Sequence, residues 1–212
     1  MSCCRPSGYD KVFGEKLARH DAKKYRRAGL PASARWIVDS VVGRGVSGAD
    51  VLEVGGGVGA IQLELLKAGA THTVNVEFSP GYEAAAAELA GEAGFTGRID
   101  RKIGDFAQDG PFDDADVVVM HRVVCCYPDY ERLIGEAAKR AQRVLVFSFP
   151  PRNLVSRTIN ASANLWMRIT RRDFRSYVHA PETMIEVARR QGLEPVARRK
   201  RRIWLAVALV RT

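Results

Sequence analysis

Apolar runs of strand length alternate with helical patterns along most of the chain. Residues 116–120, Asp-Val-Val-Val-Met, are almost continuously apolar, which is typical of a central strand covered on both faces. The predicted strands in this part of the chain are residues 51–54, 73–77, 98–103, 116–120 and 143–149. Helical patterns follow most of them, at residues 61–67, 83–92 and 130–142. The sequence therefore predicts an α/β fold with a doubly wound, mostly parallel sheet.

Both ends of the chain depart from this alternation. Residues 194–202 and 203–211 are strand-like with almost no connection between them, which predicts a C-terminal hairpin with one antiparallel strand at the sheet edge. At the other end, residues 10–28 form a basic helical pattern, and Pro31 begins a second helix that ends near Gly43. The predicted division is an N-terminal helical extension or cap at 1–45 and a main domain at 46–212, with an insertion at about 151–179.

Size and hydropathy restrict the class of protein further. With 212 residues, of which 46% are hydrophobic, the chain can bury one good core but hardly two. No run approaches 18 apolar residues, so we expect no membrane span. The first residues lack the apolar centre of a signal peptide, and we expect a cytoplasmic protein.

A glycine-rich run joins the first predicted strand to its helix. It reads Val51-Leu52-Glu53-Val54-Gly55-Gly56-Gly57-Val58-Gly59. Glycine has no Cβ, so the backbone at Gly55, Gly57 and Gly59 can turn sharply and lie against a ligand. Glu77 ends the next strand, and a carboxylate about 20 residues beyond such a turn can hold a ribose diol. These features predict a nucleoside-containing cofactor; the alternative is a tight turn without a ligand.

The same spacing is compatible with two cofactors. Gly55-x-Gly57-x-x-Ala60 satisfies a dinucleotide fingerprint, which permits alanine last. Three features favour S-adenosylmethionine. Glu53 places a carboxylate where a cationic amino group could bind but a pyrophosphate would be repelled. A long segment precedes the first strand, and the chain ends on a hairpin rather than on a second βαβαβ half. An NAD-linked oxidoreductase is the alternative.

The E-x-G-x-G-x-G run resembles motif I of the class I S-adenosylmethionine-dependent methyltransferases. Glu77 is similar to the ribose-binding acid of that superfamily. Gly104-Asp105-Phe106 resembles its adenine-edge motif, in which Asp105 would accept from the exocyclic amine and Phe106 would lie beside the ring. The resemblance implies S-adenosyl-L-methionine as cofactor and N-terminal helices that cap its site. The candidate cofactor residues are Glu53, Gly55, Gly57, Gly59, Glu77, Phe78, Asp105, Phe106 and His121.

Ligands of open α/β sheets bind beyond the carboxyl ends of the strands. His121 follows the fourth predicted strand, and Arg152 follows the fifth. For a neutral hydroxyl acceptor, His121 or His179 could act as the base, whereas a carboxylate acceptor needs no base but needs an arginine clamp such as Arg152 or Arg175. A structural hydrogen bond at the strand end is the alternative role of His121. The candidate catalytic residues are His121, Tyr127, Arg152 and His179.

A second resemblance concerns the substrate. Phe147-Ser148-Phe149-Pro150-Pro151-Arg152 is similar to the Phe-Thr-Phe-Ala-Pro-Arg stretch of the magnesium-protoporphyrin O-methyltransferases, and an Arg-rich insertion follows in both. The group's Ile-His-Tyr stretch is replaced here by Cys125-Cys126-Tyr127. Residues 154–179 of the insertion interleave aromatic residues with five arginines, which predicts a lid over a flat or anionic ligand. A helix packed on the sheet edge is the alternative.

The charge balance bears on partners. The net charge is +9, from 33 Lys+Arg and 24 Asp+Glu, and a positive field attracts anionic partners. We expect an O-methyltransferase acting on an acidic or aromatic small molecule, with a tetrapyrrole-like carboxylate as one candidate. RNA methylation and a non-catalytic S-adenosylmethionine-binding module are the alternatives, and basic residues on solvated faces would need no partner.

The four cysteines form two adjacent pairs, Cys3-Cys4 and Cys125-Cys126. Zinc sites favour spaced pairs, so the sequence predicts no metal site. Binding of a soft metal or metalloid by both pairs, if the N-terminus folds over the cleft, is the alternative.

Overall fold

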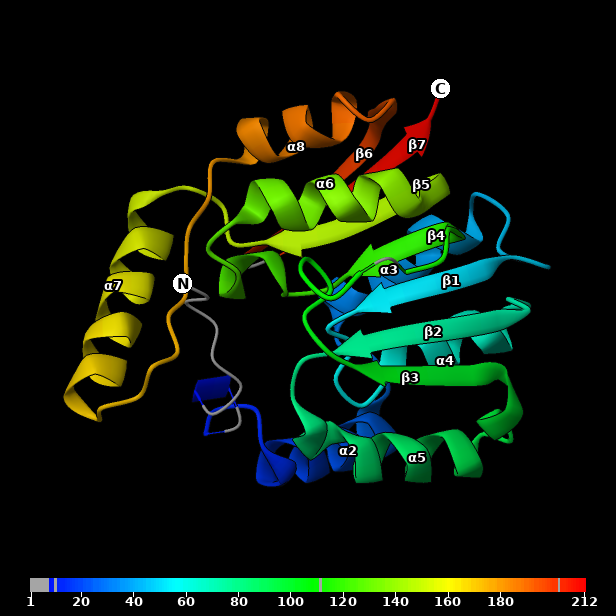
Figure 1. The fold of residues 1–212 in the computed structure, drawn as a ribbon, viewed down its shortest axis with the longest axis horizontal. Coiled ribbons are helices and arrows are strands. Elements are labelled where there is room, and N and C mark those ends of the chain that lie inside the picture. The colour runs from blue at the N-terminus through cyan, green and yellow to red at the C-terminus, as the bar shows by residue number, and fades with distance from the viewer. Residues whose placement is uncertain (1–7, 10, 111, 202) are drawn as a thin grey trace.

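The computed structural model describes residues 8–9, 11–110, 112–201 and 203–212. Figure 1 shows a sheet whose strands run side by side between layers of helices. The helices are α2 (Glu15–Ala28), α3 (Ala32–Val42), α4 (Ala60–Lys67), α5 (Glu83–Glu92), α6 (Tyr130–Arg140), α7 (Leu154–Ile169) and α8 (Pro181–Arg189). The strands are β1 (Asp50–Val54), β2 (His72–Glu77), β3 (Ile99–Ile103), β4 (Ala115–Met120), β5 (Ala141–Phe149), β6 (Leu193–Arg201) and β7 (Trp204–Arg211). The predicted strands are all present, with boundaries that differ by at most two residues.

The described strands form one sheet in the order β3-β2-β1-β4-β5-β7-β6. The first five in this order are parallel, and β7 pairs antiparallel with both β5 and β6. The fold class and the C-terminal hairpin are thus confirmed, but the antiparallel strand is not the edge strand. Val207 and Leu209 of β7 are fully buried, whereas six of the nine residues of β6 are exposed. The more apolar strand therefore takes the inner position, and Arg202 between them lies outside the described residues.

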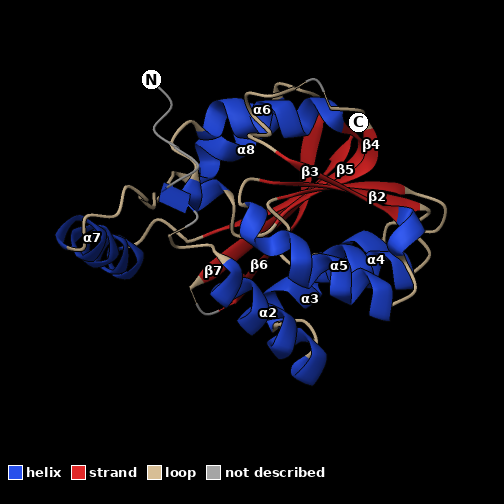
Figure 2. Ribbon diagram, turned by 60° about the horizontal axis from the view of Figure 1, so that its bottom comes forward, coloured by secondary structure: helices blue, strands red, loops and turns tan. Residues whose placement is uncertain are grey.

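Helices cover both faces of the sheet (Figure 2). On one face, α3 and α4 bury Ile37 and Leu65 against strand residues such as Val117. On the other face, α6 and α8 bury Ile134 and Ile185 in the cluster that contains Val118. Val117 and Val118 are both at most 1% exposed, as expected for a central strand.

The N-terminal helix α2 lies beside α5 at the β3 end of the sheet (Figure 1). Ala18 and Ala22 of α2 are buried against Tyr82 and Leu89. The helix begins at Glu15, and the predicted start at Asp10 lies outside the described residues. This packing brings one face of α2 over the carboxyl end of the sheet, where the resemblance placed a cap.

The insertion forms α7, which stands apart from the two helical layers (Figure 2). In the part of the chain that the structure describes, no helix combines the length and the apolar character needed to cross a membrane. Helix α7 stands on the side toward which the arrowheads of β1, β2, β4 and β5 point in Figure 1.

Candidate active site

The glycine turn between β1 and α4 has the backbone that its sequence predicts. Gly55, Gly57 and Gly59 have φ values of 64°, 58° and 77°, in the left-handed region that side chains disfavour. A Cβ on Gly57 would lie 3.2 Å from the Tyr82 ring. Gly55 and Gly57 line a cavity of about 430 Å³, whereas Gly59 forms the N-cap of α4 and is outside the cavity wall.

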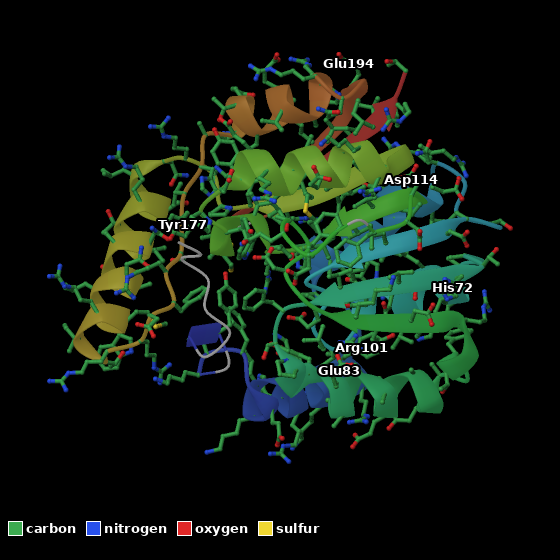
Figure 3. All side chains as sticks on the ribbon, in the orientation of Figure 1. His72, Glu83, Arg101, Asp114, Tyr177 and Glu194 are labelled. Atoms are coloured by element: carbon green, nitrogen blue, oxygen red, sulfur yellow. The ribbon has the colours of Figure 1, made fainter. Side chains whose placement is uncertain are left out.

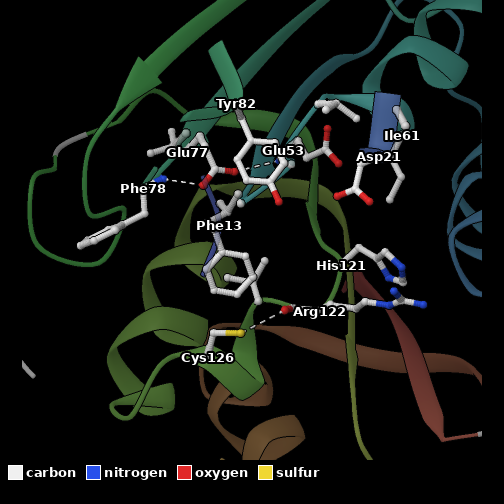
Figure 4. A pocket seen from close by; sticks show the side chains of 18 of the residues that line it. Phe13, Asp21, Glu53, Ile61, Glu77, Phe78, Tyr82, His121, Arg122 and Cys126 are labelled. Atoms are coloured by element: carbon white, nitrogen blue, oxygen red, sulfur yellow. Dashed lines mark hydrogen bonds between the residues drawn. The ribbon is translucent and has the colours of Figure 1, made fainter. Parts of the chain in front are cut away.

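Glu77 ties the end of β2 to this turn (Figure 4). Its Oε2 accepts from the Gly57 N–H at 2.8 Å, and its Oε1 accepts from the Phe78 and Ser79 N–H groups at 2.9 and 3.1 Å. Burial raises the pKa of this carboxyl, and the three backbone donors oppose that shift. The side chains of Glu77 and Phe78 both line the cavity.

Arg101 on β3 supports the turn from behind. Its Nη2 donates to the Gly57 carbonyl at 3.0 Å and lies 2.8 Å from Oε1 of Glu83, the first residue of α5 (Figure 3). The guanidinium therefore connects strand, helix and turn, which limits the movement of Gly57.

Glu53, at 1% exposure, is the most deeply buried carboxylate of the cavity wall. Its Oε2 accepts from the Gln62 N–H at 3.3 Å and from Asn75 Nδ2 at 3.5 Å. Burial raises the pKa of Glu53 to about 8. Asn75 Oδ1 and Gln62 Oε1 are buried and have no hydrogen-bond partner among the described residues. Neither Asn75 nor Gln62 lines the cavity, so of these three residues only Glu53 could contact a proton donor or a cationic group bound there.

Helix α2 closes the cavity opposite the turn. Leu17, Asp21 and Tyr25 of α2 recur every four residues, so they lie on one side of the helix, and all three line the cavity. Phe13, which precedes the helix, lines it as well. Asp21 approaches Tyr82 in Figure 4, and burial raises its pKa. Sequence reasoning missed Asp21, although its position on the same row as the apolar residues was a usable signal.

The residues after β4 form a second wall. His121 Nδ1 lies 2.9 Å from Ser148 Oγ, and His121 Nε2 lies 3.5 Å from Ser33 Oγ. Ser148 Oγ already accepts a hydrogen bond from the Arg122 N–H at 3.0 Å. We therefore assign the Ser148 hydroxyl as the donor and His121 Nδ1 as the acceptor of the bond between them. Burial and the Arg122 charge lower the pKa of His121 to about 3. His121 is therefore neutral over the physiological range.

Arg122 is the wall residue that sequence reasoning overlooked most plainly. It has φ 62°, an unusual value for a side-chain-bearing residue. Its guanidinium lies 4.8 Å from the Trp204 ring and donates to Ser33 Oγ at 3.4 Å. No salt bridge joins it to a described residue, but Cys125 and Asp21 interact with it electrostatically. The cavity wall thus carries a cation with unused donors (Figure 4).

Asp105, Phe106 and Tyr127 meet at the cavity edge. The Tyr127 hydroxyl donates to the Asp105 carboxylate, at 3.0 Å from Oδ1. Asp105 also accepts from the Ala107 N–H at 3.0 Å. Phe106 is buried and stacks on Phe112 with ring centres 5.2 Å apart. All three predicted residues line the cavity.

The other two catalytic candidates lie elsewhere. Arg152 is exposed, and His179 Nε2 lies 3.0 Å from the Tyr127 carbonyl; neither lines the cavity. No residue of the insertion lines it either, so the expected lid is wrong for this conformation. The reason is that Asn160 and Asn164 of α7 bond to Ser176 of the returning segment instead of facing the cavity.

The cysteine pair after β4 is reduced. Cys125 Sγ and Cys126 Sγ lie 3.8 Å apart, and Cys126 lines the cavity. Within the described ranges no group of three or more His, Cys, Asp or Glu residues could hold a metal ion. Cys3 and Cys4 lie outside those ranges, so the alternative, binding of a soft metal or metalloid by both pairs, is untested.

Comparisons with known proteins agree with this geometry. Residues 52–145, from β1 into β5, match the family model described as a methyltransferase domain. No curated protein matches the sequence. A magnesium protoporphyrin IX methyltransferase from Synechocystis PCC 6803, solved with bound SAH, has a TM-score of 0.74 and 20% identity over 98% of this chain and 99% of that one.

Two further solved structures are similar. An O-methyltransferase family protein from Burkholderia thailandensis has a TM-score of 0.69 and 20% identity, over 95% of this chain and 64% of that one. An S-adenosylmethionine-dependent methyltransferase from Mesorhizobium loti has a TM-score of 0.67 and 14% identity, over 85% and 99%. At these identities the likeness shows the fold.

The domain match and the glycine turn with its carboxylates define the class: the protein is an S-adenosylmethionine-dependent methyltransferase. S-adenosyl-L-methionine is its cofactor.

Proposed function

We propose that the protein transfers a methyl group from S-adenosyl-L-methionine to a carboxylate oxygen of an aromatic or otherwise apolar small molecule. The observation that carries this proposal is the composition of the wall after β4. It combines a cation without an ion-pair partner, Arg122, with a histidine that is too weak a base to activate a hydroxyl, His121.

The cavity fits the cofactor on its own residues. Glu77 Oε2 accepts one hydrogen bond in the structure and keeps capacity for a ribose hydroxyl. Glu53 lines the cavity, and its carboxylate suits a cationic amino group. S-Adenosylmethionine supplies an electrophilic methyl group on a sulfonium, so the chain has to bind, orient and exclude water.

The state of His121 decides which acceptors are compatible with the site. Among described cavity residues it is the one histidine, and we assign its Nδ1 as the acceptor of a hydrogen bond from the Ser148 hydroxyl. A base with a pKa of about 3 is too weak to deprotonate a hydroxyl group effectively. A carboxylate, with a pKa of ~4 in water, is ionised without help. We therefore favour methyl ester formation over ether formation.

Arg122 is the residue that we assign to the anionic end of the substrate. Arg122 lines the cavity, and its guanidinium packs on Trp204 and donates to Ser33 Oγ. Phe13, Phe78 and Tyr127 supply aromatic surface on the same cavity. A planar guanidinium binds a carboxylate through two parallel hydrogen bonds, which would orient one oxygen toward the methyl group.

The experiment is single-turnover transfer from methyl-labelled S-adenosylmethionine to 3-phenylpropanoate and to 3-phenylpropanol. These probes share a ring and differ in the acceptor. We expect label in the acid only, released as volatile methanol by mild alkali, as a methyl ester requires. Label that is stable to alkali, or transfer to the alcohol alone, would refute carboxylate methylation. The same assay on a metabolite extract covers acceptors that this pair does not represent.

Substitution of arginine gives the matched test. Arg122→Gln should lower kcat/KM for the acid about ten- to hundred-fold, because a charge-assisted hydrogen bond contributes about 1.5–3 kcal/mol. Arg152→Gln removes an equal charge from outside the cavity and should leave kcat/KM unchanged. Equal losses in both variants would mean that net charge, not contact, governs the rate.

A further inference from the structure

Helix α7 exposes the side that an amphipathic helix normally buries. Its large apolar side chains are each between 50% and 78% exposed: Leu154, Val155, Ile159, Leu165, Trp166 and Ile169. At 3.6 residues per turn, these six positions fall within a sector of about 140°. They therefore form one continuous apolar face, which we call the α7 face.

The opposite side of α7 is polar and turns toward the protein. Asn164 Nδ2 donates to the Ser176 carbonyl at 2.8 Å, and Asn164 Oδ1 accepts from the Ser176 N–H at 2.9 Å. The Ser176 hydroxyl donates to Asn160 Oδ1 at 2.6 Å. These hydrogen bonds fix the rotation of α7 about its own axis, so the α7 face points away from the segment that contains Ser176. Large exposed apolar patches of this kind mark interaction surfaces.

The charges around the α7 face are all positive. Arg152, Arg157, Arg168 and Arg171 are exposed, and no ion pair joins them to a described residue. No acidic residue occurs between Glu136 and Asp173. A second copy of the chain would bring two such arginine sets together, so like charges oppose self-association through this face.

We propose that α7 lies in the surface of an anionic lipid bilayer, with the α7 face among the acyl chains and the arginines at the phosphates. A basic helix with Leu, Ile and Trp on one side is the composition that binds membrane interfaces. Trp166 carries the amphipathic ring that prefers the headgroup level. The helix lies on the surface and does not cross it, in agreement with the absence of a spanning helix among the described residues.

The position of α7 relates the proposed membrane contact to the active site. It stands beyond the carboxyl ends of the parallel strands, on the same side of the sheet as the glycine turn (Figure 1). The segment through Tyr177 returns from it to the protein, where the Tyr177 N–H donates to the Cys125 carbonyl at 2.7 Å (Figure 3). Docking would hold the active-site edge of the sheet next to the bilayer.

Co-flotation with vesicles tests the proposal. The probes are phosphatidylcholine vesicles and vesicles of phosphatidylcholine mixed with phosphatidylglycerol. We expect the full chain to float with the anionic vesicles, with weaker binding to the zwitterionic ones and at high salt. The tryptophan emission, to which Trp166 contributes together with Trp36 and Trp204, should shift to the blue in the same samples. Absence of flotation with anionic vesicles would overturn the proposal.

Variants separate the α7 face from other surfaces. Trp166→Glu combined with Ile169→Glu should weaken vesicle binding at least tenfold. Val196→Glu alters an apolar side chain on β6 that is 49% exposed, and should have no effect. Binding of S-adenosylhomocysteine by each variant checks that the fold is intact. If the wild type is a dimer that the double substitution dissociates, and no variant binds lipid, the face is a self-association surface and the proposal is wrong.

Discussion

Replacing Glu53 by Gln should stabilise the ligand-free protein while weakening its binding of S-adenosylmethionine. Glu53 is 1% exposed, and burial raises its pKa to about 8 from an ordinary value of 4.5. Between these two pH values the folded chain holds a proton that the unfolded chain has lost. The stabilising contribution of the protonated group is thus complete below pH 4.5 and disappears as the pH rises to 8.

The expected size follows from the pKa difference. A pH of 7 lies 2.5 units above 4.5, the pKa of Glu53 in the unfolded chain. At ~1.4 kcal/mol for each unit, keeping Glu53 costs about 3 kcal/mol of folding free energy at this pH. The glutamine of the variant does not titrate, and its amide can both donate and accept among Gln62 and Asn75. Glu77, whose pKa burial also raises, is present in both proteins and cancels from the difference.

The assay is urea unfolding of wild type and Glu53→Gln between about pH 5 and about pH 9. We expect the two free energies of unfolding to be close at pH 5 and to diverge toward pH 8, with the variant more stable. Circular dichroism and tryptophan fluorescence should give coincident transitions. Curves that run parallel over the whole range would refute the raised pKa and the burial argument behind it.

The remaining predictions concern the cofactor site. The affinity for S-adenosylhomocysteine, measured by calorimetry, should rise from pH 6 to about 8, because only ionised Glu53 attracts the amino group of the ligand. Glu53→Gln should remove this pH dependence. An unchanged pH dependence in the variant would contradict the role assigned to Glu53. Glu77→Ala should weaken the same binding by about 1–3 kcal/mol, since polar partners lose their acceptor, and an unchanged dissociation constant would show that the ribose lies elsewhere. Gly57→Val should abolish binding, because its φ of 58° disfavours a side chain and its Cβ would press on Tyr82; retained affinity in a folded variant would count against the turn. His121→Asn should leave the shape of the pH–rate profile unchanged above pH 5, and loss of a limb near neutrality would identify His121 as a base after all.

Local patterns predicted the parts of this protein that depend on near neighbours. The glycine turn depends on backbone conformations that few residues adopt, and Glu77 ends the strand beside it. The sequence could therefore predict that Gly55, Gly57 and Glu77 line one cavity, as they do. Tertiary placement was less accessible. Asp21 reaches the cavity only because α2 packs against α5, and Arg122 is notable only for its φ and its lack of an ion pair with the described residues.

The insertion shows a limit of amphipathic patterns. Periodicity in residues 154–169 predicts a helix with an apolar face, but it does not state whether that face turns inward. Asn160, Asn164 and Ser176 decide the question through contacts that span 12 to 16 residues. The order of β6 and β7 was equally hidden, because a hairpin can join the sheet through either strand.

Crystals grown with S-adenosylhomocysteine test the central claim most directly, namely that the cavity between the glycine turn and α2 is the cofactor site. We expect its ribose hydroxyls against Glu77, its amino group beside Glu53 and its adenine near Phe106. Density for the ligand anywhere else, or a cavity filled by side chains from α2 at saturating ligand, would contradict the site.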